Sequence, residues 1–345
     1  MKPVVVGSLT RSAGKTSVII GLARAGGQPF AYLKPFGDRL LYRKKRQWDY
    51  DAALLANLFR LEEIPELITL GFDHSKLRFM YDAATTAAKL QEMAAAVQRT
   101  NAVFFVEGGR DLSYGSSVHL DPLTVAASLQ ARLLLVLSGN EAELGDQLTF
   151  LRRHVQLAGV DFAGVIVNKV KDPAEFEAMH LADLRGLGVP ILGVLPYQPV
   201  LTEFPASYLA EQLFARIIAG ERGSNRVIRN VFLATVSVPS AQHNPGFSAD
   251  GTLVVTSGDR SDMVVAAIES NAAAVLLTDD IAPPPNVLSN AEDRGIPLLL
   301  VRYTTAQAAR KLGDLDPLLT RDDTAKVTLL GDLVRQHVDL GFLRG

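Results

Sequence analysis

The sequence contains no cysteine among its 345 residues. This absence excludes disulfide bonds, cysteine-ligated metal sites and thiolate nucleophiles, including the nucleophile of a cysteine-dependent glutaminase. The 6 histidines are scattered, and no pair of them has the spacing of metal ligands. The Gly-x-Ser-x-Gly elbow of a serine hydrolase is also missing. The chain therefore offers neither thiol chemistry nor a zinc-ligand pattern.

An excess of one charge sign and long apolar runs are also lacking. The 35 basic residues nearly balance the 37 acidic ones, so a net charge of −2 provides no field that attracts nucleic acid or acidic lipid. Apolar runs such as 133–137 are too short to span a bilayer, and the first residues show no signal-peptide pattern. We therefore expect a cytoplasmic protein of about two domains, without nucleic-acid or membrane partners.

A phosphate-loop pattern lies near the start of the chain. An apolar β-branched run precedes Gly7-Ser-Leu-Thr-Arg-Ser-Ala-Gly14-Lys15-Thr16, and apolar residues at helical spacing follow it. This order of strand, glycine-containing loop and helix is typical of a P-loop, which binds phosphate through backbone N–H groups and the helix N-terminus. We predict that Lys15 reaches the outer phosphates and that the Thr16 hydroxyl binds Mg²⁺. The predicted nucleotide-binding residues of this segment are Thr10, Arg11, Ser12, Ala13, Gly14, Lys15, Thr16 and Ser17.

The match to the P-loop is imperfect, because the strict pattern places its first glycine where this sequence has Leu9. A glycine-rich turn that binds nothing is the alternative interpretation. A second signal favours the P-loop, since the buried-type strand 102–106 ends at Glu107. An acid at that position is the Walker-B arrangement, which places a carboxylate beside the metal of the nucleotide.

Apolar strands alternate with helical patterns up to about residue 219. This alternation predicts an α/β fold with a parallel sheet and helices on both of its faces. Polar residues fall at or just after the expected strand ends, where ligands bind in such sheets, namely Lys15, Lys34, Asp51, Glu107 and Asn168. For Asp51, a helix cap is the alternative to a ligand role. We expect strands over 30–33, 102–106, 133–137, 162–167 and 190–195, and helices over 52–59, 81–99, 142–157, 173–187 and 206–219.

A compositional break at 220–225 suggests a domain boundary, which gives the domains 1–222 and 223–345. The alternation restarts beyond it, so a second, smaller α/β domain is expected. Its predicted strands are 231–236, 253–256, 274–277 and 298–301. Its predicted helices are one that opens within 257–262 and runs to about 270, and those over 287–294, 305–312 and 326–337.

Residues 4–219 resemble the dethiobiotin synthetase-like branch of P-loop proteins, which includes cobyrinic acid a,c-diamide synthases. The matching pieces are the longer loop before Gly14-Lys15-Thr16, Tyr32-Leu-Lys34-Pro35, Asp51-Ala52, Val106-Glu107-Gly-Gly109, Val167-Asn168 and Gly193-Val-Leu-Pro196. The resemblance implies ATP and Mg²⁺ as cofactors. It also implies metal ligation by Thr16, Asp51 and Glu107, and contacts to the base from Asn168 and Pro196. Hard oxygen donors are what Mg²⁺ prefers, which agrees with that metal set.

Residues 226–345 look like a DRTGG domain. Gly258-Asp259-Arg260 matches the first half of that signature, whereas Ser261-Asp262-Met263 departs from Thr-Gly-Gly. The loss of two glycines removes positive-φ freedom and close backbone approach, so a ligand role for those positions is in doubt. A capped strand-to-helix turn is the alternative. The pair of domains resembles the N-terminal and middle regions of long bacterial phosphate acetyltransferases. The DRTGG resemblance implies regulation or dimerisation, and the resemblance to dethiobiotin synthetases implies a homodimer.

Three functions follow from these patterns. The first is an ATP·Mg²⁺-dependent regulatory or adaptor protein, because the chain ends where an acetyltransferase domain would begin and carries no glutaminase. The second is an ATP-dependent ligase that phosphorylates a carboxylate or carbamate, with Lys15 and Lys34 as catalytic residues and Lys34 holding a small anionic substrate. The third is a scaffold with a vestigial nucleotide site.

Overall fold

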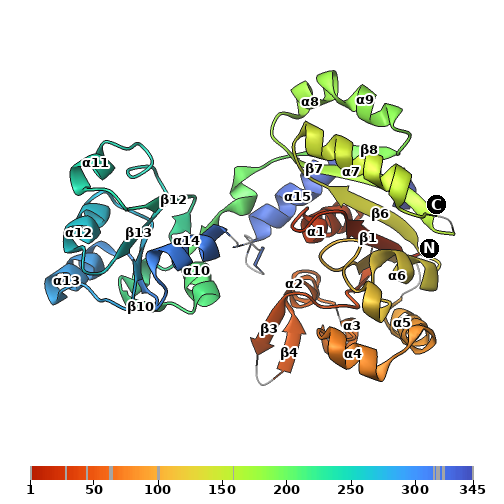
Figure 1. Cartoon of the computed structure of the whole chain (residues 1–345), viewed down its shortest axis with the longest axis horizontal. Coiled ribbons are helices and arrows are strands. Elements are labelled where there is room, and N and C mark those ends of the chain that lie inside the picture. The colour runs from red at the N-terminus through yellow and green to blue at the C-terminus, as the bar shows by residue number, and fades with distance from the viewer. Residues whose placement is uncertain are drawn as a thin grey trace. The chain divides into compact units, whose positions relative to one another are not determined.

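The structure is a computed structural model that describes residues 2–27, 29–43, 46–61, 65–98, 102–157, 159–313, 315, 319–320 and 323–343. The chain forms two compact units (Figure 1). Unit 1 comprises Met1–Gln198 together with Leu319–Gly345, and unit 2 comprises Pro199–Leu318. These bounds differ from the ranges 1–222 and 223–345 that the compositional break suggests.

A six-stranded parallel sheet forms the centre of unit 1, in the order β2-β5-β1-β6-β7-β8. Strands β1 and β5 are buried along their whole length, which explains their unbroken apolar runs. The chain moves outward from β1 in both directions, so the loop after β1 lies at a topological switch point, where such sheets bind ligands. The strands are β1 (Val4–Ser8), β2 (Phe30–Leu33), β5 (Val103–Glu107), β6 (Arg132–Leu137), β7 (Asp161–Val170) and β8 (Ile191–Pro196).

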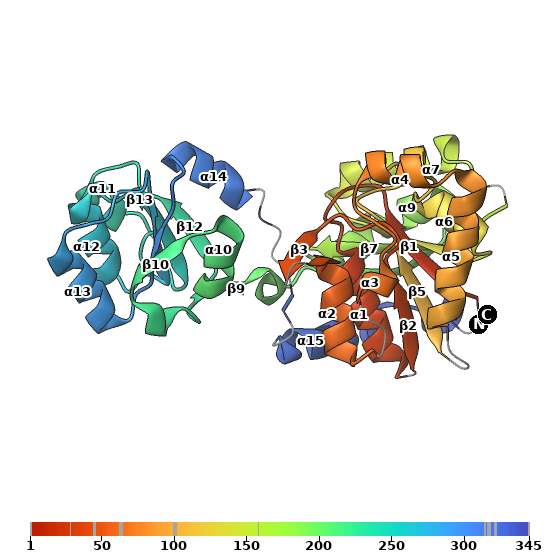
Figure 2. The same cartoon turned by 90° about the horizontal axis from the view of Figure 1, so that it is seen from below.

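Helices cover both faces of this sheet, as the alternation predicts. Helices α1, α2 and α15 lie on one side of it, and α5 and α6 lie on the other (Figure 2). The helices of unit 1 are α1 (Lys15–Gly26), α2 (Tyr50–Phe59), α3 (Pro65–Ile68), α4 (His74–Met80), α5 (Ala83–Val97), η1 (Ser116–Val118), α6 (Pro122–Ser128), α7 (Glu141–His154), α8 (Pro173–Met179), α9 (Leu181–Gly186), α15 (Thr324–His337) and η4 (Leu340–Leu343).

Three local features of unit 1 differ from the expectation. An antiparallel hairpin, β3 (Leu40–Arg43) with β4 (Arg46–Asp49), stands where the sequence pattern predicts no strand. The helix expected over 81–99 begins at Ala83, because Asp82 and Thr85 form a capping box that starts it there. The helix expected over 173–187 is two helices, and the break lies at His180, whose φ of −124° is not helical.

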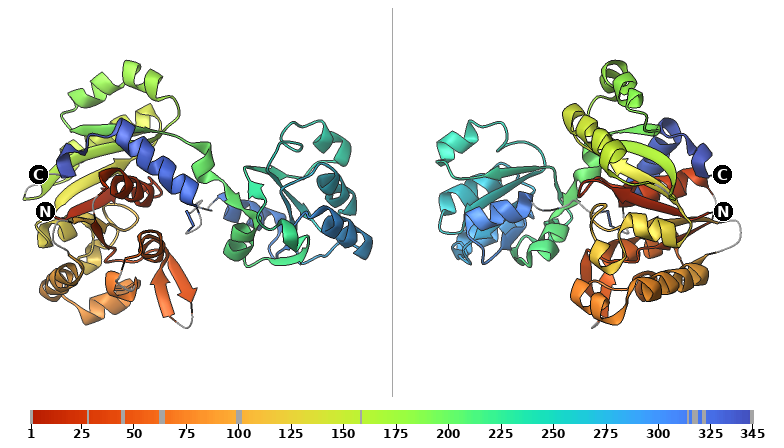
Figure 3. Two further views of the ribbon diagram at one scale, coloured as in Figure 1. Left: turned by 180° about the vertical axis from the view of Figure 1, so that it is seen from behind. Right: turned by 45° about the vertical axis from the view of Figure 1, so that its right-hand side comes forward.

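The final helix belongs to unit 1, although the sequence suggests the second domain. Helix α15 packs along α1, as Figures 1 and 3 show (blue beside dark red). Glycines permit this close approach, because an added Cβ on Gly21 would lie 2.5 Å from Val334 and one on Gly331 would lie 2.8 Å from Arg24. The sequence could not place this helix, because its helical pattern does not reveal which of the two sheets it covers.

Unit 2 contains a five-stranded sheet in the order β10-β15-β14-β13-β12, parallel except for β10. Helices α11, α12 and α13 pack on one apolar face of this sheet, and α10 and α14 pack on the other. Its elements are η2 (Pro199–Thr202), β9 (Phe204–Pro205), α10 (Ala206–Leu213), β10 (Arg216–Ala219), η3 (Glu221–Gly223), β11 (Val227–Ile228), β12 (Asn230–Leu233), α11 (Val238–Gln242), β13 (Thr252–Ser257), α12 (Ser261–Glu269), β14 (Ala274–Thr278), α13 (Pro285–Arg294), β15 (Leu298–Leu300) and α14 (Thr305–Gly313).

The helix expected over 206–219 is wrong in its second half. Helix α10 ends at Leu213, because Phe214 takes a left-handed conformation with a φ of 51°. The following residues form β10, which pairs antiparallel with β15. The expected boundary at 220–225 therefore lies inside unit 2. Within the described ranges of both units, no helix has the length and apolarity that crossing a membrane requires.

Candidate functional site

The loop between β1 and α1 has a conformation that depends on glycine. Gly14 has a φ of 97°, and a Cβ added there would lie 2.3 Å from the Asn168 Nδ2 atom. Asn168 Nδ2 donates a hydrogen bond to the Ala13 carbonyl at 2.9 Å, and Lys169 Nζ donates one to the Ser12 carbonyl at 2.7 Å. The end of β7 therefore supports the loop through these two hydrogen bonds. Helix α1 then begins at Lys15 without a side-chain cap, which leaves its first N–H groups without a side-chain acceptor.

The predicted nucleotide-binding residues Thr10–Ser17 form this loop and the first turn of α1. Thr10 and Arg11 are exposed, whereas Ala13 and Lys15 are buried. Asn168 lies against the loop through its bond to Ala13. Pro196 ends β8, the edge strand, where it pairs with Val170, and it takes no part in the charged cluster described below.

The Lys15 ammonium lies in a buried pocket of oxygen atoms. Its Nζ donates to Ser8 Oγ at 2.9 Å and to the Arg110 carbonyl at 3.1 Å. Burial lowers the pKa of Lys15, although the carboxylates of Glu107 and Asp38 act against that shift. The end of β1 and the loop after β5 thus hold the amine beside the P-loop.

Glu107 accepts two short hydrogen bonds from hydroxyl groups. Its Oε1 accepts from Thr16 Oγ1 at 2.7 Å, and its Oε2 accepts from the Tyr32 hydroxyl at 2.7 Å. Burial raises the pKa of Glu107 to about 7, while the positive charges of Lys34 and Lys15 act to lower it. The residue is therefore poised to change its charge near neutral pH.

Lys34 is surrounded by carboxylates in the interior of unit 1. Its Nζ lies 2.5 Å from Asp51 Oδ2, 2.7 Å from Asp38 Oδ1, 3.4 Å from Asp49 Oδ1 and 4.0 Å from Glu107 Oε1. Burial by itself would lower the pKa of Lys34, but these four acids raise it well above its usual value. The lysine is thus a buried cation in a shell of oxygen atoms.

Two acids separated by one residue have different tasks. Asp49 is the N-cap of α2, and its Oδ1 accepts from the N–H groups of Asp51 and Ala52 at 3.0 and 3.1 Å. Asp51 is not the cap, so its carboxylate faces Lys34 and the more distant Arg39 guanidinium, 3.6 Å away. Burial would raise the pKa of Asp51, but Lys34 and Arg39 lower it, so this carboxylate is held in its charged form.

The structure adds residues that the sequence reasoning did not assign to the site, namely Ser8, Asp38, Asp49, Tyr32 and Arg110. Tyr32 had a usable signal, since it lies two residues before Lys34 and therefore on the same side of the extended chain. Asp38 had none, because the β3–β4 hairpin intervenes between it and Asp49 in the sequence. Oxygen atoms of Asp38, Asp49 and Asp51 lie within 4.8 Å of one another.

This set of donors fits a hard divalent cation. Thr16, Asp51 and Glu107 offer only oxygen atoms, which is the chemistry that Mg²⁺ requires. The cluster already holds a cation, because the Lys34 ammonium lies within 4.0 Å of both Asp51 and Glu107. The oxygen atoms and the negative charge of this cluster are therefore suited to a metal ion.

Comparison with known proteins agrees with this architecture. The profile of the AAA domain family matches residues 2–205, and that of the DRTGG domain matches residues 208–315. The chain is 31% identical over 265 residues to a phosphate acetyltransferase of Pseudomonas putida, covering 70% of this chain and 37% of that protein. It is 27% identical over 370 residues to the phosphate acetyltransferase of Deinococcus radiodurans, covering 98% of this chain and 50% of that protein.

The chain thus spans about half or less of the length of these curated relatives. Among solved structures, the cell-division complex MinC:MinD of Aquifex aeolicus is 15% identical, with a TM-score of 0.38, and covers 58% of this chain and 84% of that one. The first profile alone covers more than half of the sequence, and the change from one profile to the next, between residues 205 and 208, lies close to the start of unit 2 at Pro199. The chain belongs to the AAA domain family, as a P-loop-type domain followed by a DRTGG domain.

Proposed function

We propose that unit 1 binds ATP together with Mg²⁺ at the loop 7–17. One observation carries this proposal: four separate segments bring the buried charges of Lys15, Lys34, Asp51 and Glu107 together at the carboxyl edge of the sheet, with the partly buried Thr16 bonded to Glu107. Buried charges are costly, and perturbed ionisable groups that converge beside a helix N-terminus are typical of binding and catalytic sites.

In this proposal different residues bind the phosphates, the base and the metal ion. The backbone N–H groups of residues 10–17 and the amine of Lys15 bind the phosphates, and Asn168 and Pro196 lie on the side of the base. Thr16, Asp51 and Glu107 hold Mg²⁺, which would neutralise charge on the outer phosphates. The Thr16 hydroxyl, which now donates to Glu107, must turn a lone pair to the metal.

We further propose that the protein is a cytoplasmic, nucleotide-dependent regulatory or adaptor protein that works as a homodimer. Unit 2 supports this proposal, since its buried polar side chains among the described residues are threonines, which provide no charged site for chemistry. Its match to the DRTGG profile agrees with a regulatory part. Unit 1 would then read the nucleotide, and unit 2 would transmit or modulate the response.

An ATP-dependent ligase is the second candidate, and the position of Lys34 favours it. A buried ammonium beside the proposed metal ligands could hold the anionic group of a second substrate once Mg²⁺ neutralises the acids. A substrate carboxylate oxygen would attack the γ-phosphorus and release ADP, and an amine would then displace phosphate from the acyl phosphate. This function requires ATP turnover that depends on one small acid and on an amine.

Thermal unfolding of the full chain with ATP and Mg²⁺ tests the nucleotide site. A ligand at one hundred times its dissociation constant adds about 2.7 kcal/mol, or roughly 5–10 °C for a unit of this size. We expect this shift in the wild type and in the surface control Lys89→Ala, but not in Lys15→Ala. An absence of any shift at millimolar ATP would favour the vestigial scaffold instead.

A further inference from the structure

The Lys34 ammonium lies among the three proposed metal ligands. Its Nζ lies 2.5 Å from Asp51 Oδ2 and 4.0 Å from Glu107 Oε1. The same Glu107 oxygen accepts the hydrogen bond of Thr16 Oγ1 at 2.7 Å. Lys34 therefore already lies beside the carboxylate oxygens to which Mg²⁺ would bind in the proposed function.

Water screens these charges little, because the groups are buried. The exposed fraction of the side chain is 2% for Lys34, 3% for Asp51 and 2% for Glu107. Asp38 and Asp49 add two more carboxylates, at 2.7 and 3.4 Å from the ammonium. Charged acids that are removed from water need a compensating charge, so the nucleotide-free cluster requires a cation.

Two further cations beside the cluster are placed differently. The Nζ atom of Lys15 donates to neutral oxygen atoms, namely Ser8 Oγ at 2.9 Å and a backbone carbonyl at 3.1 Å. The Arg39 side chain is 28% exposed, and its guanidinium lies 3.6 Å from Asp51 Oδ1, the oxygen that Lys34 does not contact most closely. Lys34 is therefore the fully buried cation that is paired with several of these acids at once.

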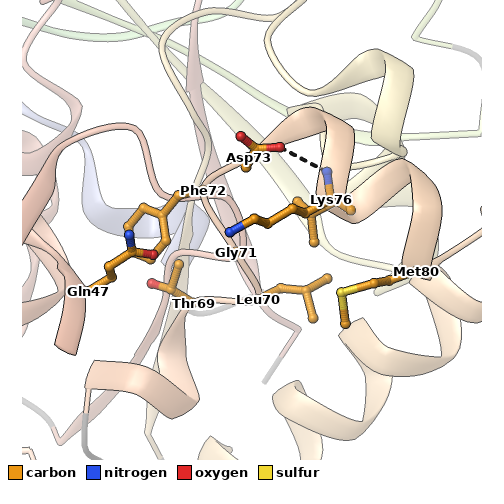
Figure 4. A pocket seen from close by; sticks show the side chains of 9 residues that line it. Gln47, Thr69, Leu70, Gly71, Phe72, Asp73, Lys76 and Met80 are labelled. Carbon is orange, nitrogen blue, oxygen red and sulfur yellow. Dashed lines mark hydrogen bonds between the residues drawn. The ribbon is translucent and has the colours of Figure 1, made fainter. Parts of the chain in front are cut away.

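The backbone of Lys34 is held by the segment beside it, so its side chain is the part that can respond to a metal ion. The Lys34 N–H donates to the Ile68 carbonyl at 3.2 Å, and the Leu70 N–H donates to the Pro35 carbonyl at 2.8 Å. A pocket of about 260 Å³ borders this segment (Figure 4), but none of the four acids around Lys34 is among the described residues that line it. The exposed Lys76 on its wall is thus a lysine of unit 1 outside the cluster.

Two cations at this cluster repel each other. A Mg²⁺ ion held by Asp51 and Glu107 would share these carboxylates with the ammonium, and the low dielectric of a buried site strengthens the repulsion between like charges. The metal therefore binds when the ammonium withdraws or when further negative charge arrives. The phosphates of ATP bring such charge, and the flexible stem of a lysine side chain allows the ammonium to move toward them.

We propose that Lys34 competes with Mg²⁺ for Asp51 and Glu107. It compensates these acids in the nucleotide-free protein and excludes the metal until phosphates are bound. This inference rests on the proposed nucleotide site, whose metal ligands it shares. It also separates Lys34 from a purely structural ion pair, because a competing lysine can be replaced by a metal ion, whereas the loss of a structural lysine only destabilises the fold.

Metal binding to the full chain without nucleotide tests the competition. MgCl₂ is titrated at an ionic strength kept constant with KCl, while thermal unfolding reports stability and calorimetry reports affinity. Two variants remove the ammonium: Lys34→Met, which leaves no donor among the acids, and Lys34→Gln, whose amide still donates to them and so favours folding. Lys76→Met is the matched control, since it removes an exposed lysine of the same unit. Asp51→Asn in the Lys34→Met background removes a proposed metal ligand as well.

We expect millimolar MgCl₂ to raise the melting temperature of both Lys34 variants by roughly 5 °C. Their affinity for Mg²⁺ should exceed that of the wild type by roughly tenfold or more. Wild type and Lys76→Met should show no such rise, and Asp51→Asn should abolish it. Three results would each overturn the proposal: a wild type stabilised as much as the Lys34 variants, neither Lys34 variant stabilised or refolded by MgCl₂, or a gain that survives Asp51→Asn.

The nucleotide site is tested in a separate arm, in which ATP and MgCl₂ are added to the wild type. A shift with ATP, without any magnesium effect on the Lys34 variants, would contradict the competition alone. Magnesium stabilisation of the Lys34 variants without any shift from ATP in the wild type would support the competition and contradict the nucleotide site. The two proposals therefore fail by different observations.

Discussion

The two units share a layered α/β design, yet their interiors differ in electrostatic character. Among the described residues of unit 1, the buried polar groups include five charged side chains of one cluster: Lys15, Lys34, Asp49, Asp51 and Glu107. The buried polar side chains described in unit 2 are Thr252, Thr256 and Thr278. Among the described residues, the buried polar groups are therefore largely charged in unit 1 and hydroxyls in unit 2.

This difference shows that unit 1 contains a cluster whose burial costs free energy of folding. Desolvating a charge costs free energy that an ion pair repays only partly, so a cluster retained in the interior indicates a function other than stability. In unit 2 the Arg260 side chain has a structural role instead. Its guanidinium donates hydrogen bonds to the carbonyls of Ala234 and Val236 at 2.6 and 2.7 Å. Substitutions in unit 1 should accordingly have large effects that depend on pH, and those in unit 2 small ones.

Replacing Lys34 should produce the largest effect on this contrast. Lys34→Ala removes the cation that lies among Asp38, Asp49 and Asp51, and leaves Arg39 as the nearest positive charge to Asp51. We expect a loss of about 3–5 kcal/mol in the free energy of unfolding, which is typical when one partner of a buried pair is removed. Urea unfolding followed by Trp48, which lies in unit 1, measures it.

The surface control for this substitution is Lys89→Ala, whose ion pair with Glu92 is solvent-exposed. It should change the free energy of unfolding by less than about 1 kcal/mol. If Lys34→Ala were no more destabilising than this control, the buried acids could not be charged in the native protein, and the contrast between the units would disappear.

The second largest effect is a pH dependence of the free energy of unfolding, caused by Glu107. Its pKa is raised from 4.5 to about 7 in the folded protein, so between these values the folded chain keeps a proton that the unfolded chain releases. Stability from this group is therefore present at low pH and falls as pH rises from about 4.5 to 7, by about 3 kcal/mol in total. Glu107→Gln removes the dependence.

The measurement is a set of urea curves for both proteins between pH 4.5 and 8. Glu107→Gln should gain stability relative to the wild type through this range and then keep a constant advantage above pH 7. A difference that stays constant from pH 4.5 to 8 would mean that Glu107 ionises normally despite its burial.

The course of the chain could be predicted in large part, and the errors have identifiable causes. Unbroken apolar runs identified β1, β5 and β6, because strands buried on both faces carry no polar alternation. The pattern predicts helix over 216–219, where the structure has β10, because a short apolar segment after a helix fits either period. The placement of α15 on α1 depends on Gly21, which lies against Val334, and on Gly331, which lies against Arg24, and these contacts exist only in the tertiary structure.

The site was predictable where its chemistry is local in sequence. Gly14-Lys15-Thr16 and a strand-ending Glu107 are short patterns with a physical reason, and the structure joins Thr16 to Glu107 by a hydrogen bond of 2.7 Å. The shell around Lys34 was not predictable, because Asp38 and Asp49 reach it through a hairpin with no local signal. The roles of Lys15, Thr16 and Glu107 toward a nucleotide and a metal remain predictions.

The smallest expected effect lies in unit 2 and concerns Thr256. This side chain is 1% exposed, and its hydroxyl has no partner within the described ranges. Thr256→Val keeps the shape and removes an unsatisfied group, so we expect a neutral change or a gain below about 1 kcal/mol. Thr278→Val is the matched control, since the Thr278 hydroxyl lies 2.9 Å from both Asp279 Oδ2 and Thr305 Oγ1 and its loss should cost about 1 kcal/mol.

Scanning calorimetry of the full chain separates these two outcomes, because each unit can unfold with its own transition. The two valines have the same size and lie on neighbouring strands, so only the hydrogen bonding differs. If Thr256→Val costs as much as Thr278→Val, the Thr256 hydroxyl must bind a water molecule or a ligand in the native protein. Unit 2 would then hold a polar site at the strand edge after all, and the contrast with unit 1 would become one of charge alone.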